Sequence, residues 1–164
     1  MSEILGTLFK YLMVILGAVA VVALFYMTLG QDKTHKAVSS ITQLQANTQA
    51  LFSTQTSFSG LSSAVAITGG LAPSDMISGS DLINPWGGAV TIAVNPSVSS
   101  RFDITTTNIP DDSCSKLASI LGAAGSSATA LAVNGTALSL PVSVAAVVAA
   151  CNSTTNSITI TSGR

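Results

Sequence analysis

The chain has 164 residues, of which only 8% are charged, and its formal net charge is −1. A chain this close to neutral lacks the basic surface that nucleic-acid binding needs, which excludes nucleic acid as a partner. Its length fits one domain plus an extended segment, and its abundance of Ala, Val, Ser and Thr is typical of extracellular filament subunits, with a simple secreted domain as the alternative.

A run of uncharged residues fills positions 11–30. About twenty residues at ~1.5 Å each cross the ~30 Å hydrocarbon core of a bilayer, so we expect a membrane-spanning helix over about residues 4–30. The run is too long for a cleavable signal peptide. Either the segment is an uncleaved anchor, or a leader has been removed ahead of Met1.

A helical pattern continues beyond this run, now with one apolar side. That side is formed by Ala37, Ile41, Leu44, Thr48 and Leu51, flanked by Val38 and Phe52. The opposite side carries Lys36, Ser39, Ser40, Gln43, Asn47 and Gln49. No proline precedes Pro73, so one helix can run from about Ser2 to about Gln55, roughly 80 Å. We therefore expect a stem helix over 1–55 and a globular head over 56–164.

Two charged residues, Glu3 and Lys10, interrupt the apolar character of the stem near its start. A charge at the centre of a membrane helix costs about 2.5–3.5 kcal/mol. Either both side chains reach the membrane interface, with Lys10 extending its aliphatic part along the lipid, or they pair with charges of a neighbouring subunit. The sequence leaves both alternatives open.

For the first part of the head, the sequence predicts connecting loops followed by a β-hairpin. Over 53–83 we expect loops and one short helix that begins near Pro73. Turn residues at 84–88 lead into a strand, and a second turn at 95–97 separates it from the next one. The inward positions alternate in both strands, at Val90, Ile92 and Val94, then at Phe102, Ile104 and Thr106.

The second part of the head mixes helices and strands. Pro110, Asp111 and Asp112 predict a helix start, which places Cys114, Leu117, Ile120 and Leu121 on one face and Gly122 at the end. Asn134-Gly135 predicts a hairpin turn within 131–138. Residues 142–151 favour a helix, although the valines also suit a strand, and 157–161 predict a last strand. The fold class is α+β, a long N-terminal helix packed on a small antiparallel sheet.

Both cysteines, Cys114 and Cys151, follow the apolar run. They can form one disulfide in an oxidising compartment, or remain as two buried free thiols. A bridge across this separation would contribute about 3–4 kcal/mol through loop closure. If it forms, the C-terminal part lies outside the cytoplasm.

No group of residues predicts catalysis or a cofactor. His35 stands alone, and Ser113 and Lys116 match a Ser-x-x-Lys pattern whose partner motifs are missing. No phosphate loop, zinc spacing or calcium loop is present in the sequence. Asn134 and Asn152 begin N-glycosylation patterns, for which unmodified turns are the favoured interpretation. We expect no enzyme activity, no cofactor and no metal.

Several segments together resemble a known family. They are Ala46–Gln49, the Asn-Pro-Trp-Gly-Gly-Ala-Val-Thr-Ile run at 84–92, residues 102–105, residues 109–118, and Cys151. In order and spacing they resemble the type IVb pilins of the PilS type, the major subunits of conjugative thin pili and of related enteric pili. The resemblance covers most of the chain.

The resemblance implies a structural protein that polymerises with itself. Such a subunit lies in the inner membrane before assembly, is trimmed by a prepilin peptidase, is methylated on its new N-terminus, here Met1, and is built by the pilus machinery into an extracellular conjugative pilus for cell attachment. The family's usual glutamate position is Leu5 here, so Met1, Glu3 and Lys10 are the expected assembly residues. A minor pilin or pseudopilin, or a membrane-anchored extracytoplasmic binding domain, is the alternative.

Overall fold

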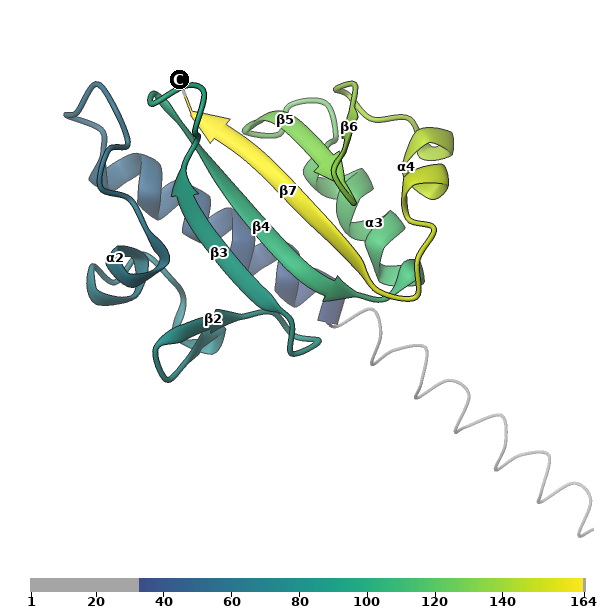
Figure 1. Ribbon diagram of the computed structural model, residues 1–164, viewed down its shortest axis with the longest axis horizontal. Coiled ribbons are helices and arrows are strands. Elements are labelled where there is room, and N and C mark those ends of the chain that lie inside the picture. Colours follow the sequence, from purple (N-terminus) through teal and green to yellow (C-terminus); the bar gives the residue numbers. More distant parts are fainter. Residues whose placement is uncertain (1–32, 164) are drawn as a thin grey trace, which may run out of the picture. The chain divides into compact units, whose positions relative to one another are not determined.

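The computed structural model describes residues 33–163 (Figure 1). The chain divides into two compact units at the boundary between Asp32 and Lys33, and the described residues belong to the second. The predicted membrane segment and the expected assembly residues Met1, Glu3 and Lys10 lie outside the described residues. Within 33–163, no helix combines the length and the hydropathy needed to span a bilayer.

The described part of the stem helix, residues 33–51, lies along one face of the sheet (Figure 1). Its predicted apolar side is confirmed by the burial of Ala37, Ile41, Leu44 and Thr48. Leu51 is an exception, because its side chain is 50% exposed. The α-helix ends at this residue and hydrogen-bonded turns follow, so the chain changes direction and Phe52 takes the inward position.

The sheet has seven antiparallel strands in the order β1-β2-β3-β4-β7-β5-β6. Its strands are β1 (Ile77–Ser78), β2 (Asp81–Ile83), β3 (Ala89–Val94), β4 (Arg101–Ile109), β5 (Ala128–Val133), β6 (Thr136–Leu138) and β7 (Asn156–Gly163). The C-terminal strand β7 is therefore internal, between β4 and β5. Because both of its edges are paired, the end of the chain is built into the centre of the fold.

The hairpin of β3 and β4 is confirmed with its predicted alternation. Ile92 pairs with Ile104, and Val94 pairs with Phe102. Five of the six predicted inward side chains are buried, namely Val90, Ile92, Phe102, Ile104 and Thr106, and the sixth, Val94, is half-buried. The opposite side chains remain exposed or half-buried, as expected for a sheet with one face toward a core.

The connection over 53–83 differs from the prediction. The short helix is α2 (Ser63–Thr68), capped by the Ser62 hydroxyl, which accepts from the Val65 N–H. Pro73 precedes only the single 3-10 turn η1 (Ser74–Met76). The prediction of loops also missed the two short strands β1 and β2. Two or three residues are too few to show an alternating pattern in the sequence.

The helices of the second half agree with the prediction. The helix α3 (Asp111–Leu121) follows Pro110 and ends at Gly122, and α4 (Val144–Ala150) begins after Ser143, whose hydroxyl accepts from the Ala146 N–H. Asn134 and Gly135 both have positive φ, as the predicted turn between β5 and β6 requires. The valine-rich segment is thus a helix, because a serine cap starts it.

Two apolar clusters lie beneath the stem helix. The first surrounds Cys114 and Cys151 and includes Ala37 and Ile41 from the stem. The second contains Leu44 and Phe52 together with the inward residues of the β3–β4 hairpin. Because the stem helix contributes to both, residues 37–52 are part of the core of the head rather than an attachment to it.

Candidate functional site

The predicted disulfide is present between Cys114 and Cys151, with Cα atoms 5.9 Å apart. It joins the first turn of α3 to the end of α4, and both cysteines are buried in the first apolar cluster. The alternative of two free thiols is therefore wrong. The bond closes the C-terminal region into one loop of the head.

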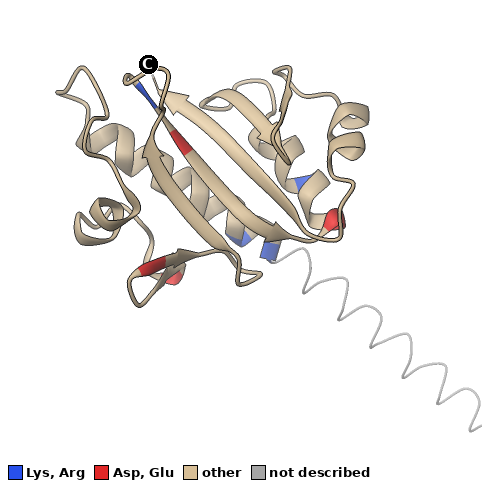
Figure 2. Cartoon of the chain, in the orientation of Figure 1, with Lys and Arg blue, Asp and Glu red and all other residues tan. Residues whose placement is uncertain are grey.

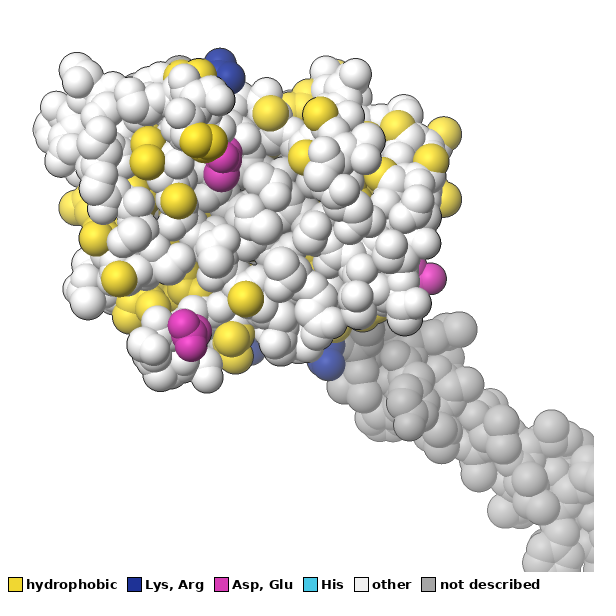
Figure 3. Space-filling model, viewed as in Figure 1, with side chains coloured by type: hydrophobic (Ala, Val, Ile, Leu, Met, Phe, Trp, Pro, Cys, Tyr) yellow, Lys and Arg dark blue, Asp and Glu magenta, His cyan; other side chains and the backbone are white. Residues whose placement is uncertain are grey.

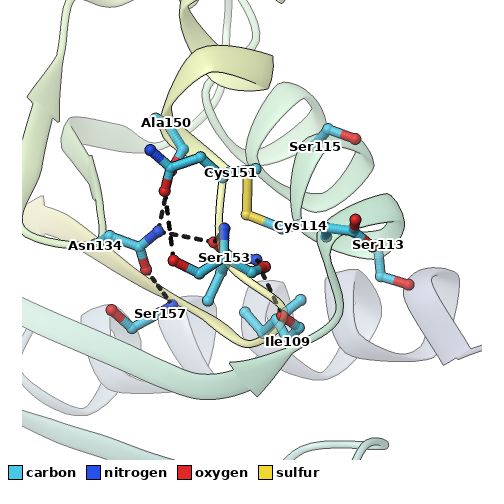
Figure 4. Close-up of a disulfide and its surroundings, with 12 residues drawn as sticks. Ile109, Ser113, Cys114, Ser115, Asn134, Ala150, Cys151, Ser153 and Ser157 are labelled. Atoms are coloured by element: carbon cyan, nitrogen blue, oxygen red, sulfur yellow. Dashed lines mark hydrogen bonds between the residues drawn. A yellow bond between two sulfur atoms is a disulfide. The ribbon is translucent and has the colours of Figure 1, made fainter.

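A group of amides beside the disulfide fixes the turn that follows α4 (Figure 4). The Asn134 amide nitrogen donates to the Ala150 carbonyl at 3.0 Å and to the Asn156 side chain at 2.7 Å. Its oxygen accepts from the Ser157 N–H at 2.9 Å. The buried Asn156 in turn donates to the Ile109 carbonyl. These contacts tie β4, β5, α4 and β7 together.

Asn134 is therefore a structural residue of the turn. Both polar atoms of its side chain are engaged, so this asparagine is unsuited to carry a glycan. The other glycosylation pattern begins at Asn152, which is exposed.

The Asn-Pro-Trp-Gly-Gly segment is a turn organised by the buried Asn84. Its side-chain oxygen accepts from the N–H groups of Trp86 and Gly88, at 3.0 and 2.9 Å. Its amide nitrogen donates to Thr106 Oγ1 at 2.9 Å and to the Thr107 carbonyl at 2.6 Å. A Cβ atom at Gly88 would overlap the backbone oxygen of Thr107, so only glycine allows this approach. These two requirements explain Asn84 and Gly88 of the motif.

Polar contacts also attach the stem helix to the head. Gln45 Nε2 donates to Ser162 Oγ at 2.7 Å, and both residues are buried. Ser40 Oγ donates to Asp75 at 3.3 Å, and Lys36 forms an ion pair with the same carboxylate at 3.6 Å. The Asn47 amide donates to the Leu71 carbonyl at 2.8 Å.

These contacts correct the predicted division of the stem helix into two sides. Ser40, assigned to the polar side, is buried, and so is Gln45, which the sequence pattern did not single out. Both lie where the helix passes over polar groups of the head. Helical periodicity alone could not find them, because their partners are 35 and 117 residues away.

The Ser-x-x-Lys pattern does not form a catalytic pair. The Ser113 side chain is buried at the start of α3 and lies close to Asp112, whereas Lys116 is exposed. In the part of the chain that the structure describes, no three His, Cys, Asp or Glu residues lie together as metal ligands. The hydrogen bonds of Gln45, Asn84 and Asn134 described above join segments of the fold.

Comparisons with known proteins agree on the family. The family model described as PilS N terminal matches residues 31–163. The crystal structure of the type IV b pilin from Salmonella typhi has a similar fold, with a TM-score of 0.61, 17% identity, and coverage of 76% of this chain and 95% of that chain. No curated protein sequence matches.

A second solved structure shares the fold. It is TcpA, a type IV pilin from Vibrio cholerae El Tor biotype, with a TM-score of 0.56 and 13% identity over 80% of this chain and 99% of that chain. At such low identities these structures support the fold, and the family model supports the membership. Pilins are structural subunits of surface pili rather than enzymes. The chain belongs to the PilS family of type IVb pilins.

Proposed function

We propose that this chain is the major subunit of a conjugative type IVb pilus, which holds donor and recipient cells together. The observation that supports it most directly is the family match across residues 31–163, which includes the described stem helix. A filament that holds cells together must carry tension along its subunits. A stem helix joined to the head through two apolar clusters and a buried hydrogen bond provides such a connection.

We further propose the order of processing and assembly steps that the family resemblance implies. The stem over residues 1–55 anchors the subunit in the inner membrane, a prepilin peptidase exposes Met1, and Met1 is methylated. The assembly machinery then moves the subunit into the pilus. Bundled stems form the filament core, and the heads over residues 56–164 form its surface.

A mating assay tests the conjugative role. Deleting the gene from donor cells should lower transfer most strongly in shaken liquid, because shear then separates pairs that no filament holds. On a solid surface, where cells are pressed together, the loss should be smaller. The complemented donor serves as control. If the deletion strain transfers as well as the complemented donor, both in shaken liquid and on the solid surface, the pilus serves another purpose.

Within this proposal, Glu3 is an assembly residue. An unpaired carboxylate in an apolar bundle is strongly disfavoured, so it needs a cation. The amino terminus of Met1 on a neighbouring stem is the first candidate. Lys10 is the second, because it lies about 10 Å further along a helix and an axially shifted neighbour would bring it level with Glu3.

The variant Glu3→Gln tests this role. We expect a sharp loss of filaments, measured as pilin in sheared cell-surface material, while the pilin level in the membrane fraction stays normal. Lys10→Met should lower the yield less, and Lys33→Met serves as the matched control, since Lys33 is an exposed lysine at the start of the described stem helix. Normal piliation in Glu3→Gln cells would place both charges at the membrane interface instead.

A further inference from the structure

The described part of the stem helix starts at the end of the head where the turn between β2 and β3 lies (Figure 1). In that turn, the half-buried Trp86 packs against the first apolar cluster, which includes Ala37 of the stem helix. Asn108, near the end of β4, donates to the Trp86 carbonyl at 3.5 Å. Three segments therefore meet at this end, and we name Lys33, Lys36 and Trp86 the base of the head.

The side chain of Trp86 is only partly satisfied by the head. Its backbone N–H donates to the side-chain oxygen of Asn84, whereas its indole N–H forms no hydrogen bond within residues 33–163 and is not buried. The ring thus has an apolar body packed on the first cluster and a polar group open to an acceptor outside the head. Tryptophan rings of this amphipathic kind are enriched where an apolar phase meets water, above all at membrane interfaces.

Charged side chains of both signs surround the indole. Lys33 and Lys36 are exposed at the start of the described helix, and Lys36 pairs with Asp75 at 3.6 Å. Asp111 and Asp112 are exposed at the start of α3 (Figure 2). Figure 3 shows hydrophobic, basic and acidic side chains together along the lower edge of the head. Binding to anionic lipid needs a cluster of basic residues, so this mixed surface fits zwitterionic headgroups, which carry both charges.

The position of the base in the chain indicates what covers it. Gly30 ends the segment that is proposed to span the membrane, and Lys33 follows it by three residues. Three residues span at most about 11 Å, even when fully extended. The headgroup layer on each side of the hydrocarbon core is about 5–8 Å thick. In the anchored subunit, Lys33 must therefore lie within the headgroup layer or directly outside it.

We propose that the base of the head lies on the membrane before assembly, with the indole of Trp86 among the lipid headgroups. The ring faces the upper part of the acyl chains, its N–H donates to a lipid oxygen, and the two lysines extend toward the phosphates. The anchor and Trp86 are then two attachment points, which limit how far the head tilts until assembly withdraws the subunit. This inference rests on the proposed membrane anchor.

Fluorescence of the full chain in lipid nanodiscs tests this contact, because Trp86 is the single tryptophan of the sequence. The discs contain phosphatidylethanolamine and phosphatidylcholine, with a spin-label quencher either on the headgroup or near the end of an acyl chain. The headgroup label should quench Trp86 at least about twofold more strongly than the deep label, as expected for a ring at the interface.

The matched control moves the single tryptophan to the other end of the head. The double variant Trp86→Phe, Val98→Trp places it in the loop between β3 and β4, at a position that is 39% exposed. Because β3 separates this loop from the turn that holds Trp86, neither label should quench the variant appreciably. Cysteines that do not react with iodoacetamide show that the disulfide of the variant is formed.

Three results would overturn the proposal: no quenching of Trp86, equal quenching of Trp86 by the two labels, or the same quenching in the control variant. A full chain that does not enter the discs would refute the proposed membrane anchor, and this inference with it. Incorporation is measured separately, as pilin that elutes with the discs, so the two failures are distinguishable.

Discussion

Gln45 of the stem helix donates a hydrogen bond to Ser162 of the last strand at 2.7 Å, across 117 residues of sequence. Both residues are buried, and Ser127 donates to the Gln45 oxygen at 3.5 Å. The stem helix is thus attached to the central strand β7 by a side chain that the solvent does not reach. Residues 37–52 of the stem helix therefore belong to the stable unit of the head. Detaching them would break this hydrogen bond and expose both apolar clusters.

A chain lacking residues 1–29 should therefore fold as a soluble monomer. It keeps the apolar side of the stem helix from Ala37 to Phe52, the sheet and the disulfide. Circular dichroism with a cooperative denaturant transition measures folding, and analytical ultracentrifugation measures the monomer. The control is a chain that begins at residue 46. It should not fold, because it lacks Ala37 and Ile41. Filaments from the first truncation would show that the stem is not the polymerisation core.

Gln45→Ala should destabilise this truncated head by about 1–3 kcal/mol, because it leaves the buried Ser162 hydroxyl without its partner. The measurement is the free energy of unfolding from urea titration. Gln43→Ala is the matched control on the exposed side of the same helix, and its effect should stay within about 0.5 kcal/mol. Equal effects of the two variants would mean that the hydrogen bond contributes nothing measurable.

Because Cys114 and Cys151 are bonded to each other, neither should react with an alkylating reagent in the native protein. Intact mass after treatment with iodoacetamide should show no addition without reductant and two additions after unfolding and reduction. The Cys114→Ser, Cys151→Ser double variant should lose about 3–4 kcal/mol of stability, as the closure of a loop over 37 residues predicts. Two thiols that react freely in the unreduced native protein would contradict the bond.

Gly88→Ala should lower the free energy of unfolding by more than about 3 kcal/mol, above the usual range for overpacking. The added methyl group would overlap the backbone oxygen of Thr107, and the backbone cannot move away as a flexible side chain can. Gly60→Ala is the comparison. Gly60 has φ +86° and no atom within 4 Å of an added Cβ, so only backbone strain of roughly 1–2 kcal/mol is expected. Urea titration of both variants compares them. A smaller loss at Gly88 than at Gly60 would refute the steric explanation of the motif.

The parts of the fold that local chemistry determines could be predicted from the sequence. Alternating residues such as Ile92 and Ile104 define the β3–β4 hairpin, Pro110 and Gly122 bound α3, and Asn134 with Gly135 defines a turn. Each of these signals lies within a few residues of the structure that it specifies.

The parts that depend on distant partners could not be predicted. Gln45 looks like a solvent-exposed residue until Ser162 is brought to it, and β1 and β2 exist only because each pairs with a neighbouring strand. Ile120 is 42% exposed, so its predicted place on the inner face of α3 is wrong, whereas the next residue, Leu121, is buried.

Electron microscopy of sheared cell-surface material tests the central claim most directly, combined with mass spectrometry of the purified filaments. The account predicts thin filaments on cells that express the full chain, none on cells in which the gene is deleted, and their return on complementation. Peptides of this chain should account for most of the filament mass, which separates a major subunit from a minor pilin. Filaments that persist in the deletion strain, or that contain this chain only in traces, would contradict the account.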